Sequence, residues 1–182
     1  MIPVGGMDLR HACMRWRAAV FLFFKEMKVK MDYNSMLDTQ SHVNKIQFII
    51  CEKIIPILRS RALLHDISKF KEPEKSTYDK YIPLLKNVKY GSDEYNEIRD
   101  KMHEEGLKHH YQVNRHHPEH FENGVNDMNL IDVVEMVCDW YTASLRSDTD
   151  FEKGLELNCK RFGIDDQLAK IIYNTYKDLF KE

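Results

Sequence analysis

The stretch NLIDVVEMVCDWYTASLR at residues 129–146 has the pattern of a long helix with one apolar face. The apolar side chains that recur at helical spacing are Leu130, Val133, Val134, Met136, Val137 and Trp140. A carboxylate, Asp139, stands inside this apolar stretch between Cys138 and Trp140. The pattern predicts a helix that packs on a hydrophobic core, and a carboxylate near a core needs a partner or a bound cation.

Helical periodicity also dominates the rest of the chain. Further helices are expected at residues 41–55, 61–70, 74–88, 94–111, 150–159 and 165–180. We expect residues 41–55 to bury one apolar face (Val43, Ile46, Ile49, Ile50 and Ile54), and Pro56 to kink or end that helix. Leu63, Leu64 and Ile67 indicate that the 61–70 helix is also buried. No stretch shows sustained period-two alternation, so the sequence predicts an all-α helical bundle in a single domain.

Charge and cysteine usage narrow the function classes. The 182 residues carry a formal net charge of −2 with acids and bases mixed, which argues against general binding of nucleic acid. The four cysteines are far apart and form no CxxC pair, so neither a zinc ribbon nor a disulfide framework is indicated, and a cytoplasmic location is the simplest interpretation.

The N-terminal region, residues 1–37, is interpreted as a leader or helix preceding a helical domain at residues 38–182. Its apolar run, Ala18 to Phe24, is too short for a membrane span or a signal-peptide core. Two alternatives stay open. The segment is a helix that docks Val20, Phe21 and Phe24 on the core, or translation begins at Met27 or Met31.

Histidines are concentrated in one segment. Six of the nine lie in HEEGLKHHYQVNRHHPEH at residues 103–120, and imidazole is a common metal ligand. His65 and Asp66 are adjacent in ALLHDISKF at residues 62–70, and His42 lies one turn before Ile46. Each of these elements also has an ordinary structural explanation, such as solvated surface histidines or a carboxylate paired with lysine or arginine. Taken together in chain order, they indicate a metal site built from several helices.

The order of these motifs resembles the HD superfamily of metal-dependent phosphohydrolases. HDISK at 65–69 is similar to the signature of that superfamily, and DWYTASLR at 139–146 is similar to the element after the last metal aspartate in its cyclic-dinucleotide phosphodiesterase branch. HDISKF and NRHHPEH resemble still more closely a small uncharacterised bacterial and phage family. The GYP element of the phosphodiesterase branch is absent, so the resemblance does not imply activity on cyclic dinucleotides.

The resemblance implies an HD-type helical fold with a specific set of ligands. His42, His65, Asp66 and Asp139 would bind a first metal ion. His116 and His117 would bind a second ion or hold the substrate phosphate, with His110 as a further ligand. A mixed nitrogen and oxygen donor set suits Mn, Fe, Co, Ni or Zn, as one or two ions.

We therefore expect a metal-dependent phosphohydrolase that acts on a phosphomonoester or a nucleotide through a metal-activated water. The catalytic candidates are Asp66, Lys69 and His117, and the candidates for substrate binding are Lys69, Asn114, Arg115 and His120. Two alternatives stay open: an HD-fold protein that binds metal, a nucleotide or a partner without turnover, and a di-iron oxygenase of the HD type. The expected partner is a small phosphorylated substrate, and the sequence does not fix the oligomeric state.

Overall fold

The computed structural model describes residues 33–181 apart from residues 90, 91 and 148, and these residues form helices and loops without a strand. The prediction of an all-α fold is confirmed. The chain divides into two compact units, Met1–Gln47 and Phe48–Glu182. Most of the predicted leader, including Val20, Phe21 and Phe24, lies outside the described residues. None of the helices described is long and apolar enough to cross a membrane.

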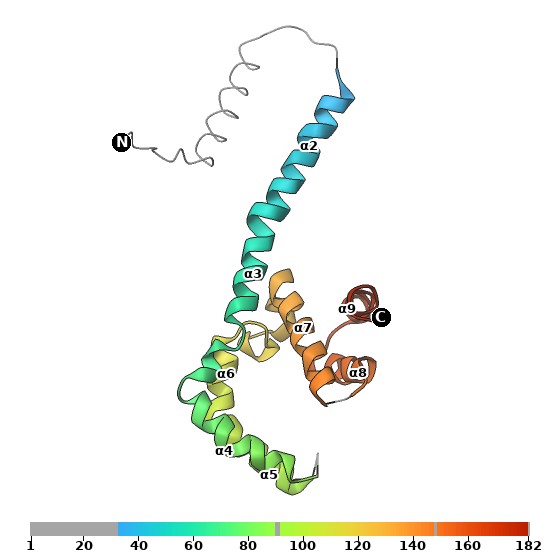
Figure 1. The fold of residues 1–182 in the computed structure, drawn as a ribbon. Helices are drawn as coiled ribbons and strands as arrows, with labels where there is room; N and C mark the ends of the chain where they lie inside the picture. Colours follow the sequence, from blue (N-terminus) through green and yellow to red (C-terminus); the bar gives the residue numbers. More distant parts are fainter. Residues whose placement is uncertain (1–32, 90–91, 148, 182) are drawn as a thin grey trace, which may run out of the picture. The chain divides into compact units, whose positions relative to one another are not determined.

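Seven α-helices follow α2 in the described part of the chain, with shorter helical turns between some of them. Figure 1 shows their arrangement. The α-helices are α2 (Ser35–Ile49), α3 (Ile55–Leu64), α4 (Glu74–Lys86), α5 (Asp93–Met102), α6 (Lys108–Val113), α7 (Leu130–Ser147), α8 (Phe151–Phe162) and α9 (Asp166–Leu179). The π-helical turns are Ile50–Ile54 and His103–Leu107, and the 3-10 turns are Ile67–Phe70, Pro118–His120 and Gly124–Asp127.

The N-terminal helical segment differs from the prediction in its burial. The residues expected to form a core face, among them Val43, Ile46 and Ile54, are between 39% and 47% exposed. Periodicity identifies the apolar side of a helix, but burial also needs a neighbouring element to cover that side. Pro56 does not end the helical run, because the π turn Ile50–Ile54 passes directly into α3 and the proline lies in the first turn of α3. The backbone before it stays helical, with the Ile55 N–H bonded to the Ile50 carbonyl oxygen. A kink at Pro56 stays a prediction.

The sequence predicted one helix at residues 61–70, but the structure interrupts it at residues 65 and 66. The α3 helix ends at Leu64, and a 3-10 turn begins at Ile67, so the adjacent His65 and Asp66 lie in the break between them. Leu63, Leu64 and Ile67 were expected to be buried, but they are 73%, 58% and 47% exposed. The single helix predicted at 94–111 is likewise divided into α5, a π turn and α6.

The remaining helices match their predicted ranges within a few residues, and side-chain caps fix where they start. Asp150 and Asp165 accept hydrogen bonds from backbone N–H groups at the starts of α8 and α9, and Ser92 does so for α5. The α7 helix packs against α8, and α8 against α9.

The hydrophobic core lies among α7, α8 and α9, with Met136, Val137, Phe151, Leu155 and Ile172 buried. The predicted apolar face of α7 was too wide, because Leu130 is 81% exposed and Val134 is 44% exposed. The α7 helix also carries three acidic residues, at 132, 135 and 139. The first two contact Arg61 of α3, and the first also contacts Arg115 in the loop after α6. Their spacing of three and four residues places them along one side of the helix.

Candidate metal centre

Asp66 occupies an unusual backbone position between α3 and the following 3-10 turn. Its φ of 56° lies in the left-handed region, where it is the one non-glycine residue among those described. This conformation is costly for most L-residues but is tolerated better by Asp and Asn. The turn it makes ends α3 and directs the carboxylate toward the histidine segment.

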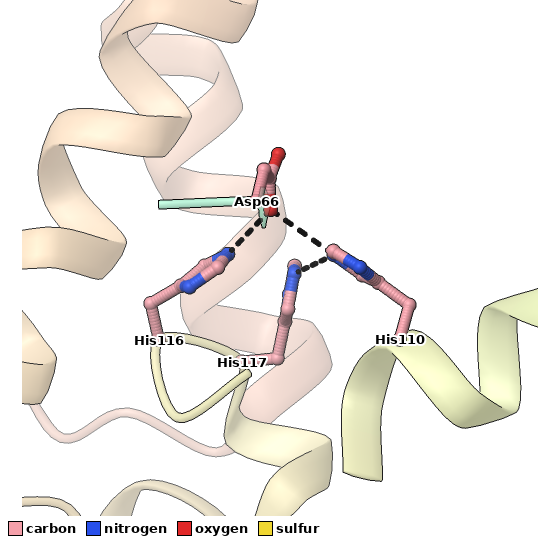
Figure 2. A group of neighbouring side chains, drawn as sticks. All are labelled: Asp66, His110, His116 and His117. Carbon is pink, nitrogen blue, oxygen red and sulfur yellow. Dashed lines mark hydrogen bonds and ion pairs between the residues drawn. The ribbon is translucent and has the colours of Figure 1, made fainter. Parts of the chain in front are cut away.

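Three histidines converge on this carboxylate, as Figure 2 shows. His110 comes from α6, and His116 and His117 come from the loop after it. Asp66 Oδ1 lies 3.4 Å from His110 Nε2 and 3.5 Å from His116 Nε2, and His110 Nε2 lies 2.8 Å from His117 Nε2. These four donor atoms are close enough together to surround one metal ion.

A second group of donors shares Asp66 with the first. His65 Nε2 lies 3.5 Å from Asp66 Oδ2 and 3.7 Å from Asp139 Oδ1. The three residues again offer ligand atoms to a common point. The structure thus brings together three residues proposed from the sequence, His65 and Asp66 from the break after α3 and Asp139 from α7. Their role as metal ligands stays a prediction.

Two carboxylates lie behind the histidines and accept from their outer nitrogens. Glu135 Oε1 is 2.9 Å from His65 Nδ1 and 3.2 Å from His116 Nδ1. Glu74 Oε2 is 2.8 Å from His110 Nδ1. Because each carboxylate can only accept, it favours a proton on Nδ1, and a neutral ring then keeps its lone pair on Nε2, which is the atom facing Asp66. Carboxylates hold metal-binding histidines in this way in many metalloproteins.

An ion-pair network around a buried carboxylate fixes the loop that carries His116. Asp132, fully buried near the start of α7, accepts from Arg115 Nε at 3.1 Å and Nη2 at 2.8 Å, and from Arg61 Nη1 at 3.0 Å. Arg61 also donates through Nε to Glu135 at 2.5 Å. The network thus ties α3, α7 and the 114–117 loop together next to the cluster.

Charge is unevenly distributed within the cluster. Hydrogen bonds to Asp139 and Glu135 raise the pKa of His65 to about 10, so this imidazole is protonated at neutral pH when no cation is present. Burial opposes ionisation of Glu135, but hydrogen bonds from His116, His65 and Arg61 hold its pKa well below its ordinary value.

The pKa of His117 shifts in the opposite direction from that of His65. Burial, together with the neighbouring His116 and His110, lowers the pKa of His117 to about 3. Burial works to raise the pKa of Asp66, but the hydrogen bond and charge of Lys69 lower it on balance. A neutral imidazole and an ionised carboxylate are the protonation states that bind a metal ion.

Two buried atoms in the cluster lack the partners that burial normally demands. Asp66 Oδ1 and His116 Nε2 have no hydrogen-bond partner among the described residues, although they face each other across 3.5 Å. Unsatisfied buried polar atoms are costly and need an explanation. A cation between them would satisfy both, and the donor set of imidazole nitrogens and carboxylate oxygens fits a divalent transition metal.

The other residues proposed from the sequence have the following places. Lys69 donates to Asp66 Oδ2 at 2.5 Å and lies over the Tyr78 ring. Asn114 is buried and donates to Ser68 Oγ at 2.8 Å. His42 lies on α2 in the first unit and is exposed, so its role as a ligand stays a prediction.

Two further candidates for substrate binding have protein partners. Arg115 pairs with Asp132 and stacks on Phe121, and His120 Nδ1 is 3.2 Å from the carbonyl oxygen of Tyr111. A cavity of about 310 Å³ lies beside His116. Its lining residues are Arg61, Leu64, Ile67, Ser68, Val113, Asn114, Arg115, His116 and Glu135. The substrate roles of Arg115 and His120 stay predictions.

Sequence reasoning missed Glu74, Glu135 and Asp132. A signal for Glu135 was available, because it lies one helical turn before Asp139 and therefore on the same side of α7. Glu74 gave no such signal, since it looks like an ordinary acidic residue in the first turn of a helix.

The fold and the site define an all-helical protein with a cluster of histidines and carboxylates that can hold a metal ion. Residues 31–178 match the model of DUF5662, a family of unknown function, and the chain belongs to that family. Neither a curated protein nor a solved structure was found that matches the chain.

Proposed function

We propose that this protein is a metal-dependent phosphohydrolase that acts on a phosphomonoester or a nucleotide-type substrate. The observation that carries the proposal is the pair of buried, unpartnered atoms, Asp66 Oδ1 and His116 Nε2, with two further imidazole nitrogens beside them. The similarity of HDISK at 65–69 and DWYTASLR at 139–146 to motifs of the HD-type phosphohydrolases adds support, because both motifs contain residues of the cluster.

Asp66, His110, His116 and His117 would hold the ion, and His65 and Asp139 extend the donor set on the other side of Asp66. When bound, a divalent ion supplies Lewis-acid chemistry, polarising a phosphoryl oxygen and lowering the pKa of a water molecule. In the hydrolysis, a water oxygen bonds to phosphorus, the ester P–O bond breaks, and the departing oxygen takes a proton. Nothing is oxidised or reduced.

The chain's own side chains have separate parts in this reaction. The Lys69 ammonium, held at Asp66 Oδ2, is a positive charge at the edge of the cluster and would offset the charge of a phosphoryl group. The organic part of the substrate would enter the cavity beside His116, where Leu64, Ile67 and Val113 give apolar contacts.

The test is a hydrolysis screen of purified protein with p-nitrophenyl phosphate and nucleoside monophosphates, in the presence of Mn²⁺ or Co²⁺. We expect phosphate release that is abolished by chelation and by His65→Ala or Asp66→Ala. His103→Ala is the matched control, because His103 is an exposed histidine outside the cluster.

The screen also separates the alternatives. A protein that binds metal but releases no phosphate from any substrate would refute the hydrolase and favour a binding role. Iron retained under air, with an optical spectrum that changes on adding substrate and oxygen, would favour the oxygenase.

A further inference from the structure

Glu74 is a fully buried carboxylate that two adjacent histidines share. Its Oε1 lies 2.8 Å from His109 Nδ1, and its Oε2 lies 2.8 Å from His110 Nδ1 and accepts from Ser68 Oγ at 2.9 Å. Burying a carboxylate is costly unless donors surround it. Three donors from two elements, α6 and the 3-10 turn Ile67–Phe70, satisfy this one, so its position at the start of α4 is closely defined.

The two histidines differ in what lies at their other nitrogen. His109 is 41% exposed and belongs to none of the groups of ligand atoms. His110 is 1% exposed, and its Nε2 faces Asp66 Oδ1 and His117 Nε2. Glu74 therefore connects a surface histidine to a histidine of the candidate metal centre.

The carboxylate also determines which nitrogen of His110 carries the proton. The Glu74 carboxylate, which accepts, lies 2.8 Å from His110 Nδ1, and the Asn114 amide nitrogen, which donates, lies 3.0 Å from it. The two amide hydrogens of Asn114 have other acceptors, Ser68 Oγ at 2.8 Å and the His110 backbone oxygen at 2.9 Å. The shorter contact, to Glu74, therefore favours Nδ1–H and leaves the lone pair on Nε2. A metal ligand must present that lone pair. Asn114 Nδ2 donates to the backbone oxygen of His110 at 2.9 Å, which holds the same turn of α6 from the other side.

We propose that Glu74 is the positioning residue of the metal centre. It fixes the tautomer and the ring orientation of His110, while His109 supplies a second donor to Glu74 and does not bind the metal. The inference rests on the proposed metal-dependent function, but it makes a claim about His110 that can be measured without metal.

The first experiment is therefore nitrogen NMR of the imidazoles in the metal-free protein, with the His110 signals assigned by their loss in His110→Gln. We expect His110 to carry its proton on Nδ1 in the wild type. In Glu74→Gln, one acceptor oxygen remains for two Nδ1–H groups, so we expect the His110 proton to reside on Nε2 in a larger share of molecules than in the wild type. A wild-type His110 protonated on Nε2 would overturn the proposal, even if Glu74→Gln did not fold.

The second experiment measures Co²⁺ affinity and the visible spectrum of bound Co²⁺. Loss of an outer carboxylate partner of this kind costs about 10- to 100-fold in metal affinity, and we expect that loss in Glu74→Gln. Glu74→Asp keeps the negative acceptor and should recover part of the affinity. His109→Gln keeps the contact between Glu74 and His110, so its affinity and spectrum should match the wild type.

The outcomes distinguish the two proposals. Equal Co²⁺ affinity in Glu74→Gln and wild type, or an equal loss in His109→Gln, would overturn the role of Glu74. A tight Co²⁺ complex with no phosphatase activity would instead count against the proposed reaction and leave the positioning role of Glu74 supported.

Discussion

Replacing Asp132 by Asn should destabilise the protein strongly, although the two side chains have almost the same shape. Asp132 is fully buried and accepts from two guanidinium groups, Arg61 and Arg115. The amide has one acceptor oxygen, and its NH₂ would face the N–H groups of an arginine. The substitution leaves two positive charges without their shared partner.

The magnitude follows from the exposure of the partners. Removing one member of a buried ion pair costs about 3–5 kcal/mol. Because the side chains of Arg61 and Arg115 are 23% and 44% exposed, water compensates part of the loss. We therefore expect a decrease of about 2–3 kcal/mol in the free energy of unfolding. For a chain of this size, that corresponds to a fall in Tm of roughly 4–12 °C.

The assay is urea unfolding of metal-free protein, followed by circular dichroism. Asp79→Asn is the matched control, because Asp79 is an exposed carboxylate paired with Lys75, and it should change stability by less than about 0.5 kcal/mol.

The acid dependence gives a second check. Burial opposes ionisation of Asp132, but the hydrogen bond from Arg115 lowers its pKa below the ordinary 3.8. The advantage of the wild type should be complete above that pH and should shrink as the pH falls through the lowered pKa. A loss below about 1 kcal/mol at neutral pH would refute the reasoning.

Three further predictions concern packing, charge and metal. A Cβ at Gly106 would lie 2.5 Å from Thr77 Oγ1 and 2.7 Å from Thr77 Cβ, so Gly106→Ala should destabilise by about 1–3 kcal/mol in thermal unfolding. A Cβ at Gly154 in α8 would meet nothing within 4 Å, so Gly154→Ala should stabilise the protein by about 0.5–1 kcal/mol. A Gly106→Ala variant more stable than Gly154→Ala would contradict this packing. Asn is tolerated at the φ of 56° that residue 66 adopts, so Asp66→Asn should change the Tm of the metal-free protein little. The same substitution should abolish Co²⁺ binding measured by calorimetry, and retained binding would show that Asp66 is not a ligand. A metal ion at 100 times its Kd should add about 2.7 kcal/mol, or roughly 5–10 °C in Tm, reversed by a chelator; an unchanged Tm would count against a specific site.

The sequence predicted helices well where a segment contributes to the core. The α7, α8 and α9 helices match their expected ranges, because apolar periodicity and an Asp or Asn near each start agree there. It failed along α2 and α3, where apolar side chains that were expected to be buried are exposed. Apolar periodicity predicts which side of a helix is apolar, but it does not predict which other element packs against that side.

The sequence predicted the candidate ligands of the site better than the residues that hold those ligands in place. Clustered histidines and the His-Asp pair are visible as residue types, and the structure brings His65, Asp66, His110, His116, His117 and Asp139 together. The left-handed turn at Asp66 could not be foreseen, because the flanking Leu64 and Ile67 continue a helical pattern. Glu74 and Asp132 act through partners that are 17 to 71 residues away in the chain, a relation that only the fold creates.

The most direct measurement is anomalous X-ray diffraction from crystals of the wild type grown with one equivalent of Zn²⁺ or Co²⁺. We expect an anomalous peak at coordination distance, about 2.0–2.2 Å, from Asp66 Oδ1 and the Nε2 atoms of the converging histidines. Saturating metal with no peak there, or with peaks only at exposed histidines such as His103, would contradict it.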